Sequence, residues 1–512
     1  MERRVVLGIG PVDRDDVVAV ARLGAGVTIS DEALAAIDAA RAHVEHLAGS
    51  GRPVYGVSTG FGALATTYIG PDSRTALQSS LVRSHAAGSG PAVESEVVRA
   101  LMLLRLATLC RGHSGVRLVV AQTYAAMLNA AITPYVPEYG SLGCSGDLAP
   151  LAHCALVATG EGEVIAPDGT RVPAASALSA AGIEPLVLAE KEGLALINGT
   201  DGMLGMLVLA LADLRTLART ADITAAMSVE VLLGTDHAFV AELQALRPHP
   251  GQAASARNLV RLLTGSGIVA SHRTDDPRVQ DAYSLRCAPQ VAGAVRDTMA
   301  HAEAVAQREL AAAIDNPVVL DDGRVESNGN FHGAPVGYVL DFLAIAAADL
   351  ASMSERRTDR MLDTARSQGL PPFLAHDPGV DSGLMIAQYT QAGIVSEMKR
   401  LAMPASVDSI PSSAMQEDHV SMGWGAARKL RRSVDGLGRV LAVEALAAAR
   451  ALELRGPLVP APGTGAVLAA IRERVAGVGP DRYLAPEIEA VRGMVADGTL
   501  AQAAQDAVGE LE

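Results

Sequence analysis

The stretch VGYVLDFLAIAAADLASMSERRTDRML, Val336 to Leu362, indicates the fold class. Its first half is apolar on nearly every side of a helix, and a helix of that kind is surrounded by other helices. A second run, Val291 to Leu310, places its apolar residues three to five positions apart, on one side of a helix. The run from Arg439 to Leu454 is similar. These patterns predict a bundle of long helices in the second half of the chain.

The composition also favours helices over sheets. The chain has 512 residues, of which 49% are hydrophobic but only 3% aromatic, so its core must consist mainly of Ala, Leu and Val. Ala and Leu are strong helix formers, whereas strands prefer β-branched and aromatic residues. No repeat of solenoid length is evident, and strands do not alternate with helices in βαβ order. We therefore expect a mainly α protein.

The N-terminal part of the chain has a different pattern. Residues 1–200 are rich in glycine and short apolar runs, which predicts a mixed, loop-rich domain ahead of a long-helix domain at 201–512. A helix is expected to begin after Ser30, whose hydroxyl can cap it, and to end near Gly49. The segment EVIAPDGTRVP predicts a small hairpin with its turn at Pro167–Gly169.

Charge and cysteine content argue against several classes of protein. The formal net charge is −15 without a long run of like charge, so nucleic acid is not an expected partner, because phosphate binding needs clustered Lys and Arg. The longest apolar window, 203–212, is about half of a membrane span, and the N-terminus has no apolar signal core. Cys110, Cys144, Cys154 and Cys287 form no C-x-x-C pair. A cytoplasmic protein is expected.

Two formal motif matches are weak. The segment GVSTG, Gly56 to Gly60, matches the nucleophile elbow of α/β-hydrolases with Ser58 as nucleophile, but that elbow needs a parallel sheet. A flexible glycine-rich loop is the favoured interpretation. His43 and His46 lie three residues apart without further ligands at matching spacing, so a solvated helix face is favoured over a metal site.

The segment GSLGCSGDLAP, Gly140 to Pro150, predicts a tight, irregular turn with two reactive side chains, Cys144 and Ser145, at its centre. Further polar clusters interrupt the apolar chain. They hold Tyr55 in RPVYGVSTGFG, His85 in LVRSHAAGSG, Asn198 in EGLALINGTDG, Gln280, Tyr283 and Arg286 in VQDAYSLRC, Phe331 in SNGNFHG and Glu417 in SAMQEDHVSM. Each cluster alone also has a structural explanation, since a buried His is usually only hydrogen-bonded and a helical acid is usually solvated.

In this order, the segments together resemble the histidine ammonia-lyase branch of the aromatic amino acid ammonia-lyase and aminomutase family. The resemblance runs from about Val54 to Met422, and its most specific strings are GSLGCSGDLAPLAH, KEGLALINGT, QDAYSLRC, NGNFHG and PASVDSIPSSAMQEDHVSMG. It implies a mainly α fold with the long central helical bundle of the fumarase/aspartase-like superfamily. It also implies a homotetramer in which each active site takes residues from three chains.

The resemblance further implies a cofactor made by the chain itself, 4-methylidene-imidazol-5-one (MIO), from Cys144, Ser145 and Gly146. The amide nitrogen of Gly146 attacks the carbonyl of Cys144, and a residue without a side chain leaves that nitrogen unobstructed. Ser145 then loses its hydroxyl as water, which leaves an electrophilic methylidene carbon. The family triad usually begins with Ala, but only the backbone carbonyl of Cys144 enters the ring, so cyclisation is expected here too. No metal and no pyridoxal phosphate (PLP) is expected.

Catalytic roles follow from the same resemblance. Besides the three ring-forming residues, Tyr55, Tyr283 and Glu417 are the expected catalytic residues, and either Tyr55 or Glu417 would accept the β-proton of the substrate. Arg286 would pair with the substrate carboxylate. Asn198 and Tyr283 would orient the amino acid and the cofactor, with Gln280 nearby.

Two positions determine the expected substrate. His85 and Glu417 would receive an imidazole ring, because a carboxylate facing an apolar phenyl ring would lose its hydration without a compensating contact. Phe331 would pack on the ring. The expected reaction converts L-histidine to trans-urocanate and ammonia. A tyrosine ammonia-lyase or aromatic aminomutase on the same scaffold is the alternative, and a non-catalytic helical scaffold is a more remote one.

Overall fold

The computed structural model describes residues 3–49, 56, 58–60, 66–274 and 276–512. The chain forms two compact units. Unit 1 comprises Met1–Leu209, Glu303–Leu340 and Pro404–Arg428, and unit 2 comprises Ala210–Ala302, Asp341–Met403 and Lys429–Glu512. The predicted domains, 1–200 and 201–512, stay a prediction, and the units add two later segments to the N-terminal residues.

Unit 1 is mixed and loop-rich in its N-terminal part. Its helices and strands before the long helices are β1 (Arg4–Leu7), α1 (Arg14–Arg22), β2 (Gly26–Ile29), α2 (Asp31–Gly49), α3 (Arg74–His85), β3 (Ser89–Ala92), α4 (Ser95–Cys110), α5 (Leu118–Asn129), β4 (Thr133–Pro134), β5 (Pro137–Tyr139), α6 (Leu148–Ala158), β6 (Glu163–Ile165), β7 (Arg171–Pro173), α7 (Ala174–Ala180) and α8 (Glu192–Ile197). The strands β8 (Val318–Val319) and β9 (Val325–Glu326) come from the later segment 303–340. Helix α4 lies at the core, with every residue from Val97 to Cys110 buried.

Local predictions for this unit are confirmed in two places and wrong in one. The Ser30 hydroxyl accepts the Ala33 amide at 3.2 Å at the start of α2, and β6 pairs with β7 in an antiparallel hairpin. However, β1 and β2 pair in parallel with α1 between them, so one βαβ unit is present. Its strands have four residues each, too few to stand out as a period in the sequence.

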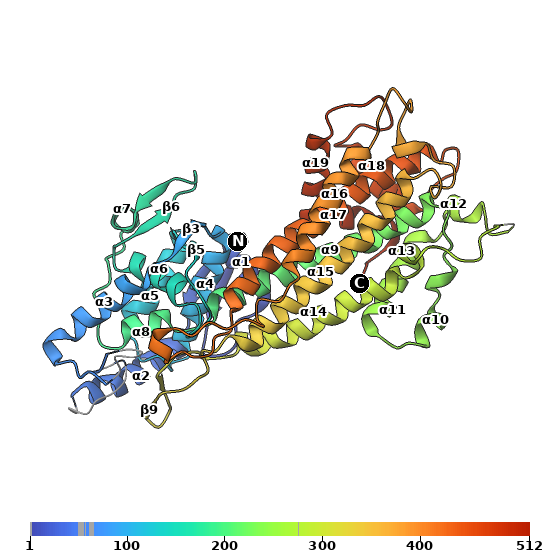
Figure 1. Ribbon diagram of the computed structural model, residues 1–512. Helices are drawn as coiled ribbons and strands as arrows, with labels where there is room; N and C mark the ends of the chain where they lie inside the picture. Colours follow the sequence, from blue (N-terminus) through green and yellow to red (C-terminus); the bar gives the residue numbers. More distant parts are fainter. Residues whose placement is uncertain (1–2, 50–55, 57, 61–65, 275) are drawn as a thin grey trace. The chain divides into compact units, whose positions relative to one another are not determined.

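Four long helices have one end in unit 1 and most of their length in unit 2: α9 (Asp201–Val231), α14 (Ala288–Leu310), α15 (Ala334–Leu362) and α17 (Gly423–Leu454). They run side by side in unit 2 (Figure 1), where buried polar contacts join them. Arg296 of α14 pairs with Asp222 of α9 at 2.7 Å. Glu444 of α17 accepts Ser228 of α9 at 2.7 Å and Arg357 of α15 at 2.5 Å. The predicted helical bundle is thus confirmed.

The apolar run at Arg439–Leu454 is only the second half of α17, which begins at Gly423. The first half also has an apolar period that the prediction missed, since Trp424, Ala427, Leu430, Val434 and Leu437 are buried at spacings of three or four residues. Lys429 pairs with Asp341 at 2.6 Å and Arg431 pairs with Asp213 at 2.8 Å, so these cations face acids of neighbouring helices. Ion pairs therefore flank an apolar stripe in this half of the helix.

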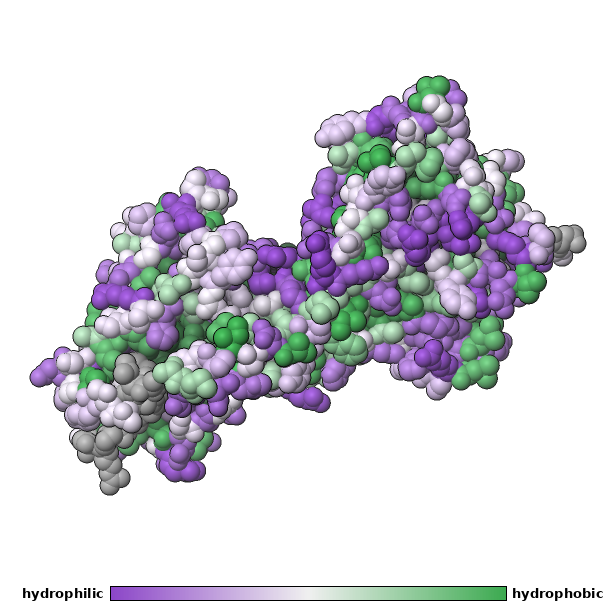
Figure 2. All heavy atoms as spheres, in the orientation of Figure 1, coloured by the Kyte–Doolittle hydropathy of each residue, from purple (hydrophilic) through white to green (hydrophobic). Residues whose placement is uncertain are grey.

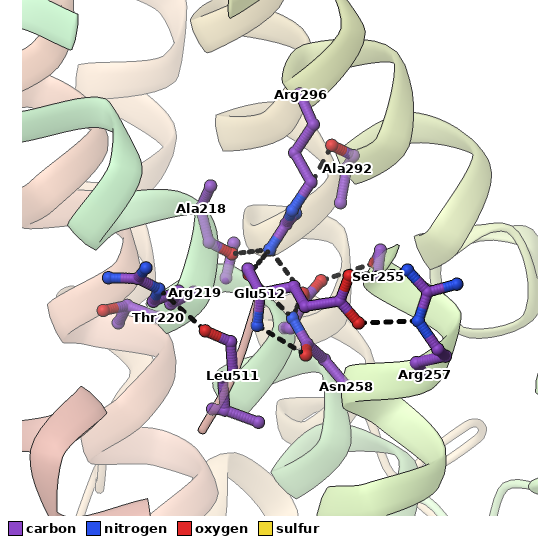
Figure 3. A network of polar contacts seen from close by, with 12 residues as sticks. Ala218, Arg219, Thr220, Ser255, Arg257, Asn258, Ala292, Arg296, Leu511 and Glu512 are labelled. Atoms are coloured by element: carbon purple, nitrogen blue, oxygen red, sulfur yellow. Dashed lines mark hydrogen bonds and ion pairs between the residues drawn. The ribbon is translucent and has the colours of Figure 1, made fainter. Parts of the chain in front are cut away.

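Shorter helices cover the rest of unit 2. They are α10 (Ala241–Ala245), α11 (Pro250–Leu263), α12 (Gly267–Ala270), α13 (Tyr283–Arg286), α16 (Met385–Leu401), α18 (Pro462–Arg472), α19 (Ala485–Ala496) and α20 (Thr499–Val508). Beyond α20, Leu511 is fully buried, and Glu512 is held by α11 and α14 (Figure 3). The Asn258 amide group donates to the Glu512 main-chain oxygen at 3.0 Å, and Arg296 donates to the same oxygen at 3.1 Å.

One helix among the described residues, α15, is long and apolar enough to cross a membrane by length and composition. This differs from the expectation that 203–212 is the longest apolar window. Within unit 2, Leu343, Ala344 and Ala347 of α15 are fully buried, and 61% of its most apolar window is buried overall, which is what a core helix requires. On the face drawn in Figure 2, hydrophilic and hydrophobic residues are intermixed.

Candidate active site

The turn that contains residues 144–146 is fixed on its N-terminal side by a segment from far along the chain. The Ser421 hydroxyl donates to the Gly143 carbonyl at 3.0 Å. The Met422 amide donates to the Leu142 carbonyl at 2.9 Å. These two hydrogen bonds join residues that are almost three hundred positions apart in the sequence, and they fix the first residues of the turn.

The C-terminal side of the turn rests on Gly199. The Asp147 amide donates to the Gly199 carbonyl at 2.7 Å, and Gly146 and Gly199 form a parallel β-bridge. Gly146 has φ +81°, and a Cβ atom on it would lie 2.0 Å from the Gly199 carbonyl oxygen. Only glycine fits this position, because both the backbone angle and the contact exclude a side chain.

Asp147 is fully buried directly after the turn. Its Oδ2 accepts the Met203 amide at 2.9 Å and its Oδ1 accepts the Ser141 hydroxyl at 3.1 Å. Burial raises the pKa of Asp147 to about 7, and the nearby Asp201 adds to the rise while the hydrogen bonds oppose it. The carboxyl is therefore protonated in part near neutral pH.

The raised pKa of Asp147 predicts a pH-dependent stability. A folded pKa of about 7 against 3.8 in the unfolded chain means that the stability this group contributes is present below pH 4 and is lost as the pH rises toward 7. The Asp147→Asn variant removes this titration. We expect the thermal midpoint of the wild type, relative to that of the variant, to fall between pH 4 and pH 7 and then to level off. A constant difference across that range would mean that the folded carboxyl is already ionised at pH 4.

Glu417 reaches the turn from a short loop. Its Oε1 accepts the Ser145 hydroxyl at 3.4 Å, and its Oε2 accepts the Ser412 hydroxyl at 2.8 Å. Ser412 and Glu417 also pair through their backbones in an antiparallel bridge. Between them Ser413, Ala414 and Met415 all have left-handed φ, from 50° to 69°. Three such residues in a row cost on the order of 1 kcal/mol each, and the Ser412 contacts hold this strained loop.

His85 lies at the end of α3, within electrostatic reach of Glu417. Its Nδ1 is 2.9 Å from the Leu81 carbonyl and 3.1 Å from the Ser84 hydroxyl. Burial lowers the pKa of His85, while the Leu81 carbonyl and the charge of Glu417 oppose that effect. A neutral imidazole thus lies near a carboxylate at the turn, and both groups can exchange hydrogen bonds with a polar ring.

Phe331 is half-buried in the loop before α15. Its neighbour His332 stacks on His419 with ring centroids 5.5 Å apart and an interplanar angle of 6°. Because His419 follows Glu417 by two residues, this stacking brings the loop of Phe331 to the loop of Glu417.

Asn198 is 3% exposed at the end of α8. Its side-chain amide donates to the Asn316 carbonyl at 2.9 Å, and the next residue is the Gly199 that supports the turn. Unit 1 therefore brings together five of the residues predicted from sequence with Gly146: Cys144, Ser145, His85, Asn198 and Glu417.

Unit 2 brings together a second group. Arg286 donates to the Gln280 side-chain oxygen at 2.9 Å and to the Asp281 carbonyl at 3.0 Å, and its guanidinium lies 4.6 Å from the centre of the Tyr283 ring. Only Tyr283 and Arg286 are helical, since Gln280 precedes α13. Arg286 thus contacts both Gln280 and Tyr283, which precede it by six and three residues, although only one helical turn is present.

Tyr55 lies outside the described residues. The Cys144 thiol is partly buried, and burial raises its pKa to about 12, with the charge of Glu417 adding to the rise. The thiol is therefore protonated at neutral pH and is a poor nucleophile.

Sequence reasoning missed Arg105 and Gly199. Arg105 is fully buried on α4, where it binds Asp201 and the Asn198 carbonyl. A signal for it exists, because Arg105 is a lone charge inside the apolar run ALMLLRLATLC. Gly199 lies in the string KEGLALINGT, but the sequence indicates no role for it, since its role depends on Gly146 lying against it.

The chain is similar in sequence and in structure to known proteins. The sequence profile described as aromatic amino acid lyase matches residues 12–473. The chain is 67% identical over 508 residues to histidine ammonia-lyase of Streptomyces coelicolor, covering 99% of each chain. Its structure is similar to the tyrosine aminomutase of Streptomyces globisporus, with a TM-score of 0.94 at 38% identity over 99% of this chain and 100% of the other.

A further solved structure, the histidine ammonia-lyase of Trypanosoma cruzi, has a TM-score of 0.91 at 39% identity, covering 99% of this chain and 96% of the other. The family profile extends over Cys144–Gly146, the Asn198 loop, the Arg286 group and the Glu417 loop alike. The chain therefore belongs to the aromatic amino acid lyase family.

Proposed function

We propose that this protein is a carbon–nitrogen lyase that removes ammonia from L-histidine to give trans-urocanate. The observation that carries the proposal is the Glu417 carboxylate, 3.4 Å from the Ser145 hydroxyl, with the neutral His85 imidazole near it. A carboxylate is a poor neighbour for a phenyl ring but can accept a hydrogen bond from an imidazole N–H. The identity to the Streptomyces coelicolor histidine ammonia-lyase supports the same substrate.

The proposal includes an MIO ring made from Cys144, Ser145 and Gly146, the cofactor that the family uses. The residues present fit such a ring. Gly146 presents a backbone nitrogen without a side chain in a position where a Cβ is excluded, and the Ser145 hydroxyl is a leaving group beside a carboxylate. When formed, the ring supplies an electrophilic carbon that turns the amino group of the substrate into a better leaving group. Neither a metal nor PLP is part of the proposal.

The chain's own side chains would bind and orient the substrate. Arg286 offers a guanidinium to the α-carboxylate, with its Nη2 and Nε already ordered by Gln280 and the Asp281 carbonyl. Tyr283 lies against the same guanidinium. His85 and Glu417 would hold the imidazole ring, and Phe331 would pack on it. Asn198 would orient the amino acid, and Tyr55 or Glu417 would take the β-proton.

We also propose a cytoplasmic homotetramer in which each active site takes residues from three chains. The two groups of predicted residues lie in different units, Gln280, Tyr283 and Arg286 in unit 2 and the ring-forming turn in unit 1. In the proposed tetramer, the Arg286 group and the ring-forming turn of one active site would come from different chains. Analytical ultracentrifugation would measure the assembly.

Release of ammonia from a panel of amino acids tests the substrate. Histidine should be deaminated efficiently, with urocanate as the product, whereas tyrosine and phenylalanine should release little ammonia. A preference for tyrosine, or formation of a β-amino acid, would instead support the aminomutase or tyrosine ammonia-lyase alternative. A chain inactive on all three amino acids would support the non-catalytic scaffold.

The Glu417→Gln variant tests the role of the carboxylate in that panel. A hydrogen bond to a charged group contributes about 1.5–3 kcal/mol, so kcat/KM for histidine should fall by about tenfold to more than a hundredfold. The matched control is Glu397→Gln on the exposed side of α16, which should leave turnover unchanged. Unaltered histidine turnover in Glu417→Gln would remove the specificity role of this residue.

A further inference from the structure

We propose that Arg105 is a positioning residue for ring closure, which holds the Asn198–Gly199 backbone against Gly146. The inference rests on the proposed MIO ring and adds a residue that acts on its formation without touching the substrate. Arg105 lies on α4 with 0% of its side chain exposed.

The guanidinium of Arg105 binds the backbone segment that contacts the turn. It donates to the Ala195 carbonyl at 3.0 Å, to the Ile314 carbonyl at 2.9 Å and to the Asn198 carbonyl. It also pairs with the Asp201 carboxylate at 3.1 Å. A planar guanidinium with five donors can hold several acceptors in fixed directions, which the compact ammonium of lysine cannot do.

Gly199 is packed between this ion pair and the turn. On one side, a Cβ on Gly199 would lie 2.3 Å from Asp201 Oδ2 and 2.6 Å from Arg105 Nη2. On the other side, a Cβ on Gly146 would lie 2.0 Å from the Gly199 carbonyl oxygen and 2.3 Å from the Gly199 carbonyl carbon. The order of contact is therefore Arg105 and Asp201, then Gly199, then Gly146, with no space between the layers for a methyl group.

The opposite side of the turn is fixed as well, by the hydrogen bonds from Ser421 and Met422 to Gly143 and Leu142. The turn therefore lies between two supports. If the support at Gly199 moves away, Gly146 can follow it, because the Asp147 amide is bound to the Gly199 carbonyl at 2.7 Å. The distance between the Gly146 nitrogen and the Cys144 carbonyl carbon thus depends on where Arg105 holds Gly199.

Ring closure is sensitive to that distance. The Gly146 nitrogen forms a bond to the Cys144 carbonyl carbon, and the carbonyl oxygen leaves as water with the amide protons of Ser145 and Gly146. Ser145 then loses its α-proton and its hydroxyl as a second water. The two steps need no oxidant or other reagent, so their rate depends on geometry and local acid–base groups. A displacement of the reacting atoms by about 1 Å can slow such an intramolecular reaction by about a hundredfold.

Intact mass spectrometry of freshly synthesised protein tests the inference. Chains with a closed, dehydrated ring are two waters lighter than the sequence mass, so the fraction of closed chains can be followed in time after synthesis is stopped. We expect closure in Arg105→Lys to be slower than in the wild type by about tenfold or more. The matched control is Arg99→Lys on the same helix, because Arg99 is also buried and also binds carbonyls, those of Val20 and Leu128.

The control separates positioning from general stability. Both variants should lose thermal stability, but only Arg105→Lys should retain chains of full sequence mass while folded. Equal closure rates in the two variants would overturn the inference. If Arg105→Lys yields no soluble protein, Asp201→Asn decides in its place, since it loosens the guanidinium with a side chain of the same size. Unslowed closure in Asp201→Asn would then overturn the inference, and a wild type of full sequence mass would overturn the proposed ring itself.

Discussion

Replacement of Ser145 by Ala should abolish ammonia release from histidine. Alanine has no β-hydroxyl to lose as water, so no electrophilic carbon can form at residue 145. The loss of a covalent catalytic group is expected to lower kcat by roughly 10³-fold or more. Intact mass spectrometry should give the full sequence mass of the variant, and the fold should be retained because the contact of the Ser145 hydroxyl with Glu417 is long, at 3.4 Å.

The matched control is Cys144→Ala in the same turn. Only the backbone carbonyl of residue 144 enters the ring, so this variant should still lose two waters and keep most of its activity. The Cys144 thiol is protonated at neutral pH because burial raises its pKa to about 12, which leaves it no role as a nucleophile. Activity in Ser145→Ala, or its loss in Cys144→Ala with an intact ring, would contradict the proposed assignment of the tripeptide.

Replacement of Gly146 by Ala should remove ring closure and destabilise the protein. The added methyl group would lie 2.0 Å from the Gly199 carbonyl oxygen, and the residue would need to keep φ at +81°. Because Gly199 is backed by Arg105 and Asp201, it cannot move away to make room. We expect a loss of stability on the order of 3 kcal/mol. Thermal unfolding and intact mass measure the two effects.

Gly169→Ala is the matched control for this variant. Gly169 has φ +82°, nearly the same backbone conformation, but a Cβ there would meet no atom within 4 Å. The control therefore carries the backbone strain of about 1–2 kcal/mol without the contact. A Gly146→Ala protein that closes its ring, or that is no less stable than Gly169→Ala, would show that the contact with Gly199 does not constrain the turn.

Local sequence patterns were sufficient to predict the helices whose formation depends on residues close together in the chain. The apolar period predicts the helix at 291–310, the nearly all-apolar first half predicts the helix at 336–362, and the capping residue Ser30 predicts α2. The first half of α17 is missing from the prediction, although Trp424, Ala427, Leu430, Val434 and Leu437 recur there at helical spacing and are buried. Only the ion pairs of its basic residues with acids on other helices could not be predicted, because they join residues that are distant in sequence.

Some residues of the candidate site were also indicated by the sequence, whereas others have a role only through contacts with distant residues. Ser145, His85, Asn198, Arg286 and Glu417 follow from the resemblance of the motif strings to the family. Polar and ionisable side chains of this kind are also conspicuous in an apolar chain. Arg286 contacts both Gln280 and Tyr283, which lie six and three residues before it, and these separations are compatible with contact. The string KEGLALINGT contains Gly199 but indicates no role for it, since a glycine gains its role only from the atoms packed on both sides of it.

The sequence by itself determined the helical class, because Ala and Leu are strong helix formers whereas strands prefer β-branched and aromatic residues. Its resemblance to the family indicated the tripeptide that we propose to cyclise, which ends in a glycine whose nitrogen is unobstructed by a side chain. Tertiary structure alone decided how that tripeptide is held. The supports of the turn come from Gly199, Ser421 and Met422, and Arg105 fixes the first of them. Such contacts join residues far apart in the chain, so they arise only when the core packs.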